Sequence, residues 1–208
     1  PQRKTLVQQV LRAGQCDVIM GVTDGTPGLE TTLPYYRSSY VFLYRKDAPF
    51  HVTSFDDAAL KNLKIGVQIT GDGAPPPNFA LSHRGLTPNL EGFPVTGNYD
   101  TEAPVLPIVT AVTNGEIDIA VLWGPIAGYF TKHQNTAMEV IPVKPEFEPP
   151  ALAMVFPISV GLRSGEKDFA DLINRTLVKR WDDIQAVLDE YGVPQLPLAR
   201  PRLSLTEN

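Results

Sequence analysis

The chain has 208 residues, of which 43% are hydrophobic and 20% charged, which is typical of a globular protein with one large domain or two small lobes. Its net charge is −5 and it has no run rich in Lys or Arg, which argues against nucleic acid and anionic membranes as partners. No apolar run reaches the length that spans a bilayer, so we expect no membrane insertion.

The first predicted element is an amphipathic helix in the opening stretch PQRKTLVQQVLRAG, which Gly14 can end in a left-handed conformation. No strand and no signal peptide precede it, so we expect an N-terminally truncated chain whose signal peptide was removed. Cys16 is the only cysteine. It is interpreted either as a buried small residue or as half of a disulfide with an upstream cysteine.

One pattern then occurs twice, in GQCDVIMGV (14–22) and in GEIDIAVLW (115–123). Each copy follows an amphipathic stretch, and each ends in a short apolar run that is typical of a buried parallel strand. A helix followed by a strand, twice, predicts two α/β units, each with its own parallel sheet. We expect Asp17 and Asp118 to hold local turns at the two strand starts.

Further elements follow in chain order. The segments between the copies predict a strand at 40–45, a strand at 65–70 and a Gly-rich loop that enters a helix through prolines. After the second copy we expect a short helix at 124–133, a strand at 138–143 and a long strand at 153–163. A last helix has one continuous apolar face from Phe169 to Tyr191, with Ser164 as its predicted cap and Gly192 at its end.

The element order predicts an α/β protein of two lobes joined by two crossing strands, with a ligand cleft between the lobes. The predicted boundaries are residues 1–44 and 151–195 for lobe 1, 45–150 for lobe 2, and 196–208 for a mobile tail.

The motif order resembles type II periplasmic solute-binding proteins, from CDVIMGVTDG and PYYRSSYVFLYRKD to GEIDIAVLWGPIAGYF. The resemblance covers Gln2 to Pro194 and implies that lobe 1 lacks its opening strand–helix–strand. Amino-acid binders of this family pair the ligand carboxylate with an Arg close after a Thr or Ser, and the ammonium with an acid at a strand end. Here Thr23 is followed by no Arg before Arg37, and the strand ends at Trp123. Both ligand charges would stay unpaired, which argues against an amino-acid ligand.

The phrases PYYRSSYVF and LWGPIAGY resemble a narrower group, the MoxJ/XoxJ-type proteins encoded beside quinoprotein alcohol dehydrogenases in methylotrophs. The resemblance implies a periplasmic accessory protein of a PQQ-dependent methanol dehydrogenase. Such a protein would bind the enzyme, or a segment of it, in an apolar interlobe cleft to aid maturation or activation. The enzyme's cytochrome c is a further candidate partner.

Ligands of open α/β sheets bind at the carboxyl ends of strands, and this rule selects the candidate residues. Trp123 either lines the cleft or lies buried under the helix that follows it. Tyr35 and Tyr36 lie at the mouth of a strand, beside Arg37, which either holds an anion or pairs with an acid. The predicted ligand and partner residues are Thr23, Asp24, Tyr35, Tyr36, Arg37, Gly71, Asp72, Trp123, Gly124 and Tyr129.

No catalytic or metal-binding motif is present in the sequence. His51, His83 and His133 are not at the spacing of metal ligands, and there is no nucleophile elbow, Walker loop or Rossmann fingerprint. Asp24 and Asp72 are the one acidic pair that could meet a cation, and turn and cap chemistry accounts for them as well. We therefore expect a protein that is not an enzyme and has no cofactor or metal.

Two functions are compatible with these observations. A dehydrogenase accessory protein predicts a wide apolar cleft with few charges. The alternative is a solute receptor of an ABC transporter for a small uncharged or anionic compound, which predicts a closable pocket with three or more convergent polar groups.

Overall fold

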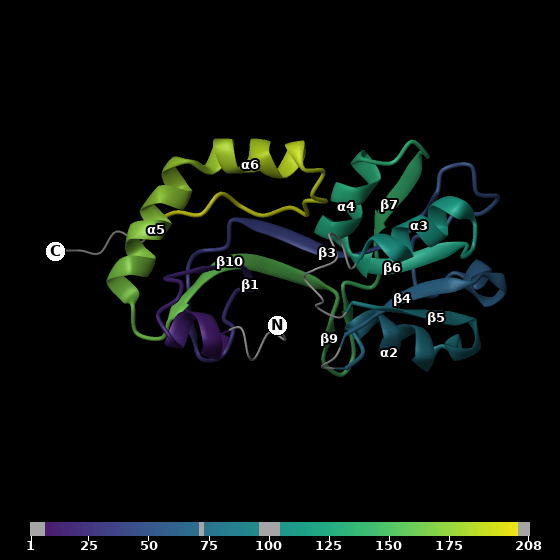
Figure 1. Ribbon diagram of the computed structural model, residues 1–208, viewed down its shortest axis with the longest axis horizontal. Coiled ribbons are helices and arrows are strands. Elements are labelled where there is room, and N and C mark those ends of the chain that lie inside the picture. Colours follow the sequence, from purple (N-terminus) through teal and green to yellow (C-terminus); the bar gives the residue numbers. More distant parts are fainter. Residues whose placement is uncertain (1–6, 71–72, 96–104, 204–208) are drawn as a thin grey trace. The chain divides into compact units, whose positions relative to one another are not determined.

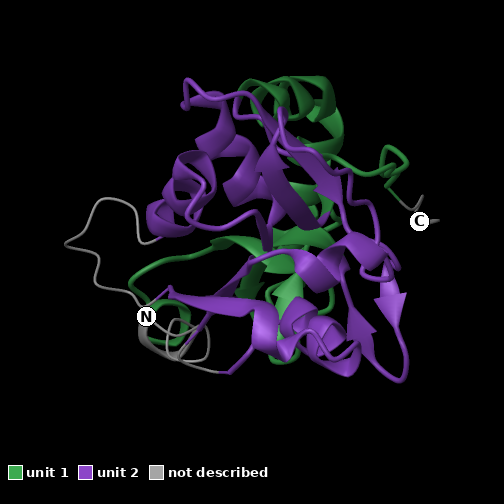
Figure 2. Ribbon diagram, turned by 90° about the vertical axis from the view of Figure 1, so that its right-hand side faces the viewer, with its two compact units in different colours: residues 1–38, 156–190, 195–208 green, residues 39–155, 191–194 purple. Residues whose placement is uncertain are grey.

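The computed structural model describes residues 7–70, 73–95 and 105–203 and divides into two compact units (Figure 1). Unit 1 comprises residues 1–38, 156–190 and 195–208, and unit 2 comprises residues 39–155 and 191–194 (Figure 2). The chain passes from unit 1 to unit 2 within one long strand and returns within another. The lobe boundaries predicted from the sequence stay a prediction.

Unit 1 contains strands that pair around β10. Its elements are the helical turn Val7–Arg12, β1 (Ile19–Thr23), β2 (Leu29–Thr31), the start of β3 (Tyr36–Arg45), most of β10 (Val155–Arg163), α5 (Lys167–Lys179) and α6 (Trp181–Glu190). Both β1 and β2 pair antiparallel with β10, in registers that include Met20 opposite Val160 and Thr31 opposite Gly161.

The prediction of a buried parallel strand at 17–22 is wrong. β1 is antiparallel to β10, and Met20 is 60% exposed. The strand is also irregular, because its register with β10 shifts between Met20 and Val22, around Gly21 with a φ of 79°. An apolar run predicts a strand but not the direction of its neighbour, since the same side chains suit both kinds of ladder.

Arg163 joins the start of the described chain to β10. Its guanidinium donates to the carbonyl oxygens of Leu11 (3.2 Å) and Cys16 (3.0 Å) and pairs with Asp17 (2.9 Å) and Glu166 (2.7 Å). Asp17 therefore holds a long-range ion pair rather than a local turn. Cys16 is exposed, because it lies in the turn before β1, so its interpretation as a buried residue is wrong.

Asp118, at the start of the second repeated strand, also makes a long-range contact. Its carboxylate accepts the backbone N–H of Lys64 at 2.7 Å. Asp118 therefore links the starts of β4 (Ile65–Ile69) and β6 (Ile119–Trp123), two neighbouring strands, instead of holding a local turn.

The predicted continuous final helix is two helices, α5 and α6, which meet at Arg180 (Figure 1). Arg180 leaves helical geometry with a φ of −103° and a ψ of 20°. Each half keeps part of the apolar stripe, and Leu177 and Trp181 are buried on either side of the break. Hydrophobic periodicity does not reveal such a break, because a one-residue change of direction leaves the spacing of the stripe nearly intact. The predicted Ser164 cap is also wrong, since α5 begins after Glu166 without a side-chain cap.

Leu196 and Arg200, in the segment predicted as a mobile tail, make specific contacts. The backbone N–H of Leu196 donates to the carbonyl oxygen of Arg37 at 2.8 Å. Further along, Arg200 donates to the carboxylate of Asp182 at 3.3 Å and to the carbonyl oxygen of Val178 at 3.1 Å. These bonds hold the segment against the start of β3 and against α5 and α6 of the same unit.

Unit 2 is a mixed sheet with helices. Its elements are most of β3, the 3₁₀ turns Ala58–Asn62 and Thr87–Asn89, β4 (Ile65–Ile69), α2 (Pro76–His83), β5 (Leu90–Pro94), α3 (Leu106–Asn114), β6 (Ile119–Trp123), α4 (Gly124–Lys132), β7 (Met138–Pro142), β8 (Phe147–Glu148) and β9 (Leu152–Ala153). β4 is parallel to β5 and to β6, whereas β3 is antiparallel to β6 and to β7. The parallel strand predicted from the second repeat is confirmed as β6.

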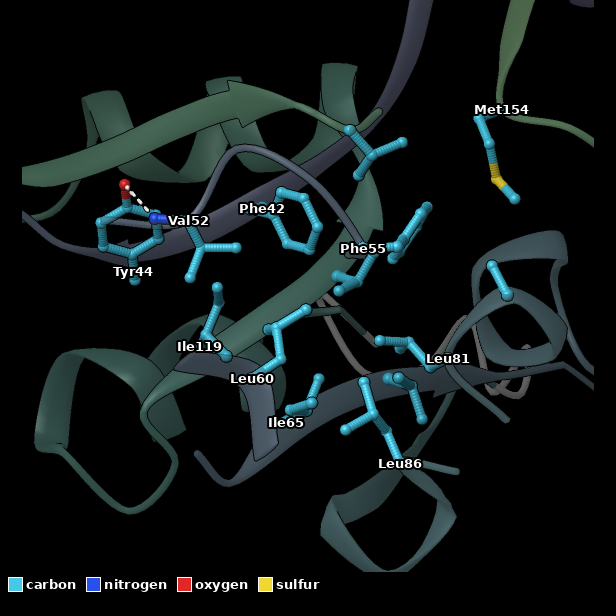
Figure 3. Packing of buried hydrophobic residues seen from close by; sticks show 14 residues of the cluster. Phe42, Tyr44, Val52, Phe55, Leu60, Ile65, Leu81, Leu86, Ile119 and Met154 are labelled. Atoms are coloured by element: carbon cyan, nitrogen blue, oxygen red, sulfur yellow. Dashed lines mark hydrogen bonds between the residues drawn. The ribbon is translucent and has the colours of Figure 1, made fainter. Parts of the chain in front are cut away.

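Successive side chains of β3 point to opposite faces of the sheet, so they contribute to two separate core clusters of unit 2. Phe42 and Tyr44 belong to the cluster that includes Leu60 and Leu81 (Figure 3), and Val41 and Leu43 belong to the cluster with α3 and α4. The phenolic oxygen of Tyr44 accepts the backbone N–H of Val52 at 3.4 Å, and burial raises its pKa, so this buried tyrosine stays neutral.

Candidate functional site

The carboxyl ends of β4, β5 and β6 meet at one edge of unit 2, because these three strands are parallel. This is the position at which open α/β sheets bind ligands. We call the described residues 68–70, 73–79, 94–95 and 123–126 the strand-end edge. None of these described residues has an ionisable side chain. The predicted residues Gly71 and Asp72 lie outside the described residues.

Trp123 ends β6 and is the residue before the first turn of α4. It is partly buried, and Tyr40 lies opposite it in the antiparallel register of β3 with β6. The two rings meet edge to face, with centroids 5.5 Å apart and planes at 72°. Gly124, the next candidate, is buried in the first turn of α4. The structure therefore places an aromatic pair at the strand-end edge.

Gln68 is a residue of this edge that the sequence did not single out. It is 7% exposed, and its side-chain oxygen accepts the backbone N–H of Trp123 at 3.3 Å. Its main-chain oxygen accepts the side-chain amide of Asn78, near the start of α2, at 3.1 Å. The available signal was one amide within the apolar run IGVQI, one residue before β4 ends at Ile69.

Two exposed apolar side chains belong to the same edge. Ile69 is 45% exposed and Phe79 is 47% exposed. The described side chains of the edge are thus aromatic, aliphatic or neutral polar, and the side chain of Gln68 is nearly buried. Such a surface can bind apolar groups and neutral hydrogen-bonding groups, and it has no described counter-ion for an ammonium.

Tyr129 lies in the second turn of α4 and not at the end of a strand. Its ring stacks on Tyr191, with centroids 5.9 Å apart and planes at 16°, and contacts His133 at 4.5 Å. Its contacts hold the segment Tyr191–Pro194 on α4. A role of Tyr129 in binding stays a prediction.

Thr23 ends β1 in unit 1, and Asp24 begins the turn that follows it. The carboxylate of Asp24 accepts the hydroxyl of Thr31 at 3.0 Å and that of Ser159 at 3.4 Å. The carbonyl oxygen of Thr23 accepts the hydroxyl of Thr26. This is the turn chemistry that the sequence left as the alternative to cation binding.

Tyr35, Tyr36 and Arg37 lie at the start of β3. Tyr35 is 8% exposed, the rings of Tyr35 and Tyr36 meet edge to face at 5.0 Å, and burial raises the pKa of both phenols. They are neutral hydrogen-bonding groups at physiological pH. Tyr36 and Arg37 also line a groove of about 430 Å³ in unit 1, whose other lining residues are Gln185, Asp189, Gln195, Leu196, Pro197 and Leu198. Whether the candidates of the two units bind one ligand stays a prediction.

Among the described residues, no three His, Cys, Asp or Glu side chains are grouped as metal ligands. Within those same parts of the chain, every helix is too short or too polar to cross a bilayer.

No family model matches the chain. Protein MoxJ of Methylorubrum extorquens is 27% identical over 203 residues, which are 93% of this chain and 67% of MoxJ. The crystal structure of MxaJ from Methlophaga aminisulfidivorans MPT has a TM-score of 0.77 at 29% identity and is matched over 93% of this chain and 81% of MxaJ. The crystal structure of the periplasmic binding protein XoxJ from Methylobacterium extorquens AM1 has a TM-score of 0.70 at 33% identity, over 88% of this chain and 76% of XoxJ.

These structures confirm the predicted fold class, an α/β fold of the type II periplasmic binding proteins. The likeness extends over both units, because it covers most of the chain in each comparison. With one third of the residues identical to XoxJ across three quarters of its length, the chain belongs to the MoxJ/XoxJ family of periplasmic binding proteins.

Proposed function

We propose that this protein is a periplasmic accessory of a PQQ-dependent methanol dehydrogenase. It binds the enzyme, or a segment of it, and aids its maturation or activation without catalysing a reaction. The observation that carries the proposal is the strand-end edge of unit 2, which contains Trp123 and Gln68 and no described charge. Tyr40 of β3 packs against Trp123.

The chemistry of this edge supports a protein segment as the occupant. A buried aromatic residue with an apolar surround is the usual anchor of a protein interface, and a few polar groups give it specificity. A free amino acid would leave its ammonium without a described partner at this edge, which costs binding free energy.

Replacing Trp123 with Ala should weaken binding to the purified dehydrogenase by about tenfold or more, because truncation of an interface tryptophan removes a large apolar contact. Isothermal titration calorimetry measures the affinity, and circular dichroism checks that the fold is retained. Phe147→Ala is the matched control, since Phe147 is a 52% exposed aromatic residue of unit 2 outside the strand-end edge. Equal affinity of W123A and wild type would contradict the proposal.

A pull-down from periplasm with the protein separates the two functions. Recovery of the dehydrogenase is the expected result. Recovery of transporter components without the dehydrogenase would instead support a receptor for a small uncharged or anionic solute.

A further inference from the structure

The side chain of Gln68 fills the place where two parallel strands of unit 2 separate. The pairing of β4 with β6 extends from Ile65 opposite Ile119 to Val67 opposite Val121, whereas β4 stays paired with β5 up to Ile69. Beyond this point the backbone N–H of Trp123 donates to the side-chain oxygen of Gln68 at 3.3 Å. The amide thus holds β6 at the point where the strand turns into α4.

The hydrogen bond from the backbone N–H of Trp123 determines which way the side-chain amide of Gln68 is turned. A backbone N–H donates only to an acceptor, so the oxygen of the Gln68 amide must face Trp123, and no amide flip is compatible with the contact. The main chain of Gln68 is fixed as well, since its carbonyl oxygen accepts from Asn78. The oxygen already accepts one hydrogen bond, from Trp123, and the NH₂ is the neutral hydrogen-bond donor of the side chain.

We propose that Gln68 is the polar recognition group of the strand-end edge, and that it donates from its NH₂ to a carbonyl oxygen of a bound peptide segment whose apolar side chain packs on Trp123. This inference rests on the proposed function, because the segment belongs to the dehydrogenase. Beyond that function, it specifies what the bound segment is like: the segment is uncharged and has a carbonyl oxygen without an internal partner next to an apolar residue. A buried amide of this kind discriminates strongly, since an occupant without an acceptor leaves the NH₂ unpaired.

The test uses purified PQQ-dependent methanol dehydrogenase as the probe and three variants of the protein. Gln68→Glu has the same shape and keeps an oxygen for the N–H of Trp123, but it replaces the donor with a second acceptor. We expect its affinity in calorimetry to fall about tenfold or more, with hydrogen exchange at the amide of Trp123 staying slow. Gln68→Met loses both groups, so its affinity should fall and the exchange at Trp123 should become faster.

Asn135→Ala is the matched control, because it removes an exposed side-chain amide of unit 2 that lies outside the strand-end edge. Its affinity should stay within about twofold of wild type. Wild-type affinity in Gln68→Glu and Gln68→Met would overturn the inference and leave the proposed function standing. A wild-type chain that does not bind the enzyme would overturn both.

Discussion

Replacing Gly128 with Ala lowers the free energy of unfolding by about 2–3 kcal/mol, which is the usual cost of forcing an extra group into a packed contact. Gly128 lies in α4, where the segment Tyr191–Pro194 of the same unit crosses the helix at very close range. A Cβ on Gly128 would overlap the carbonyl oxygen of Gly192 and would lie 3.0 Å from Cδ of Pro194. Gly192 is itself restricted to glycine by its φ of 70°, a left-handed conformation that strains other residues.

The direction of the stability change shows whether the contact at Gly128 is as close as the structure has it. In an unobstructed helix the change from Gly to Ala stabilises by about 1 kcal/mol, because Ala has the better helix propensity. Thermal unfolding should instead show a melting temperature about 5–10 °C lower than that of wild type. Thr110→Ala, at an exposed position of α3, is the control and should change stability by no more than about 0.5 kcal/mol. A Gly128→Ala variant as stable as wild type would show that the contact can relax.

Arg84→Met destabilises unit 2 by about 3–5 kcal/mol, because it leaves a buried carboxylate without its partner. Arg84 donates to both oxygens of Glu148, at 2.7 and 2.8 Å, and Glu148 is only 8% exposed. The same guanidinium bonds to the carbonyl oxygen of Ala80 at 2.8 Å and lies 5.7 Å from the ring centre of Phe55. Arg84 therefore joins α2 to β8 and to the loop before Ala58.

Urea unfolding measures this loss, and the double variant Arg84→Met/Glu148→Leu identifies its cause. Replacing both charges with apolar groups removes the unpaired carboxylate, so most of the lost stability should return. If the double variant is as unstable as Arg84→Met, the loss comes from packing and not from the uncompensated charge.

Asp56 also pairs with Arg84, at 2.7 Å, and this hydrogen bond lowers the pKa of its carboxyl group. A lowered pKa in the folded state means that the contribution of Asp56 is present at neutral pH and is lost as the pH falls through that pKa. The side chain of Asp56 is 69% exposed, so Asp56→Ala should cost far less than Arg84→Met.

The candidate site was partly readable from the sequence. The rule that ligands bind at the carboxyl ends of parallel strands selected Trp123 and Gly124, and the structure places both at such an edge. Gln68 was missed because one amide in an apolar strand has no spacing signal of its own. Its importance depends on the backbone of β6, which is 55 residues away along the chain. Tyr129 was also among the predicted residues, and its ring contacts Tyr191, Phe130 and His133.

What the sequence determined by itself was the kind and order of most elements and the family. Apolar periodicity and the turn residues are local properties, so they predicted β6, α4 and the two long strands β3 and β10 correctly. The direction of β1, the break at Arg180, and the partners of Asp17 and Glu148 were decided only by the tertiary structure. Each depends on which distant backbone or charge lies next to the residue, and a single sequence does not record that neighbour.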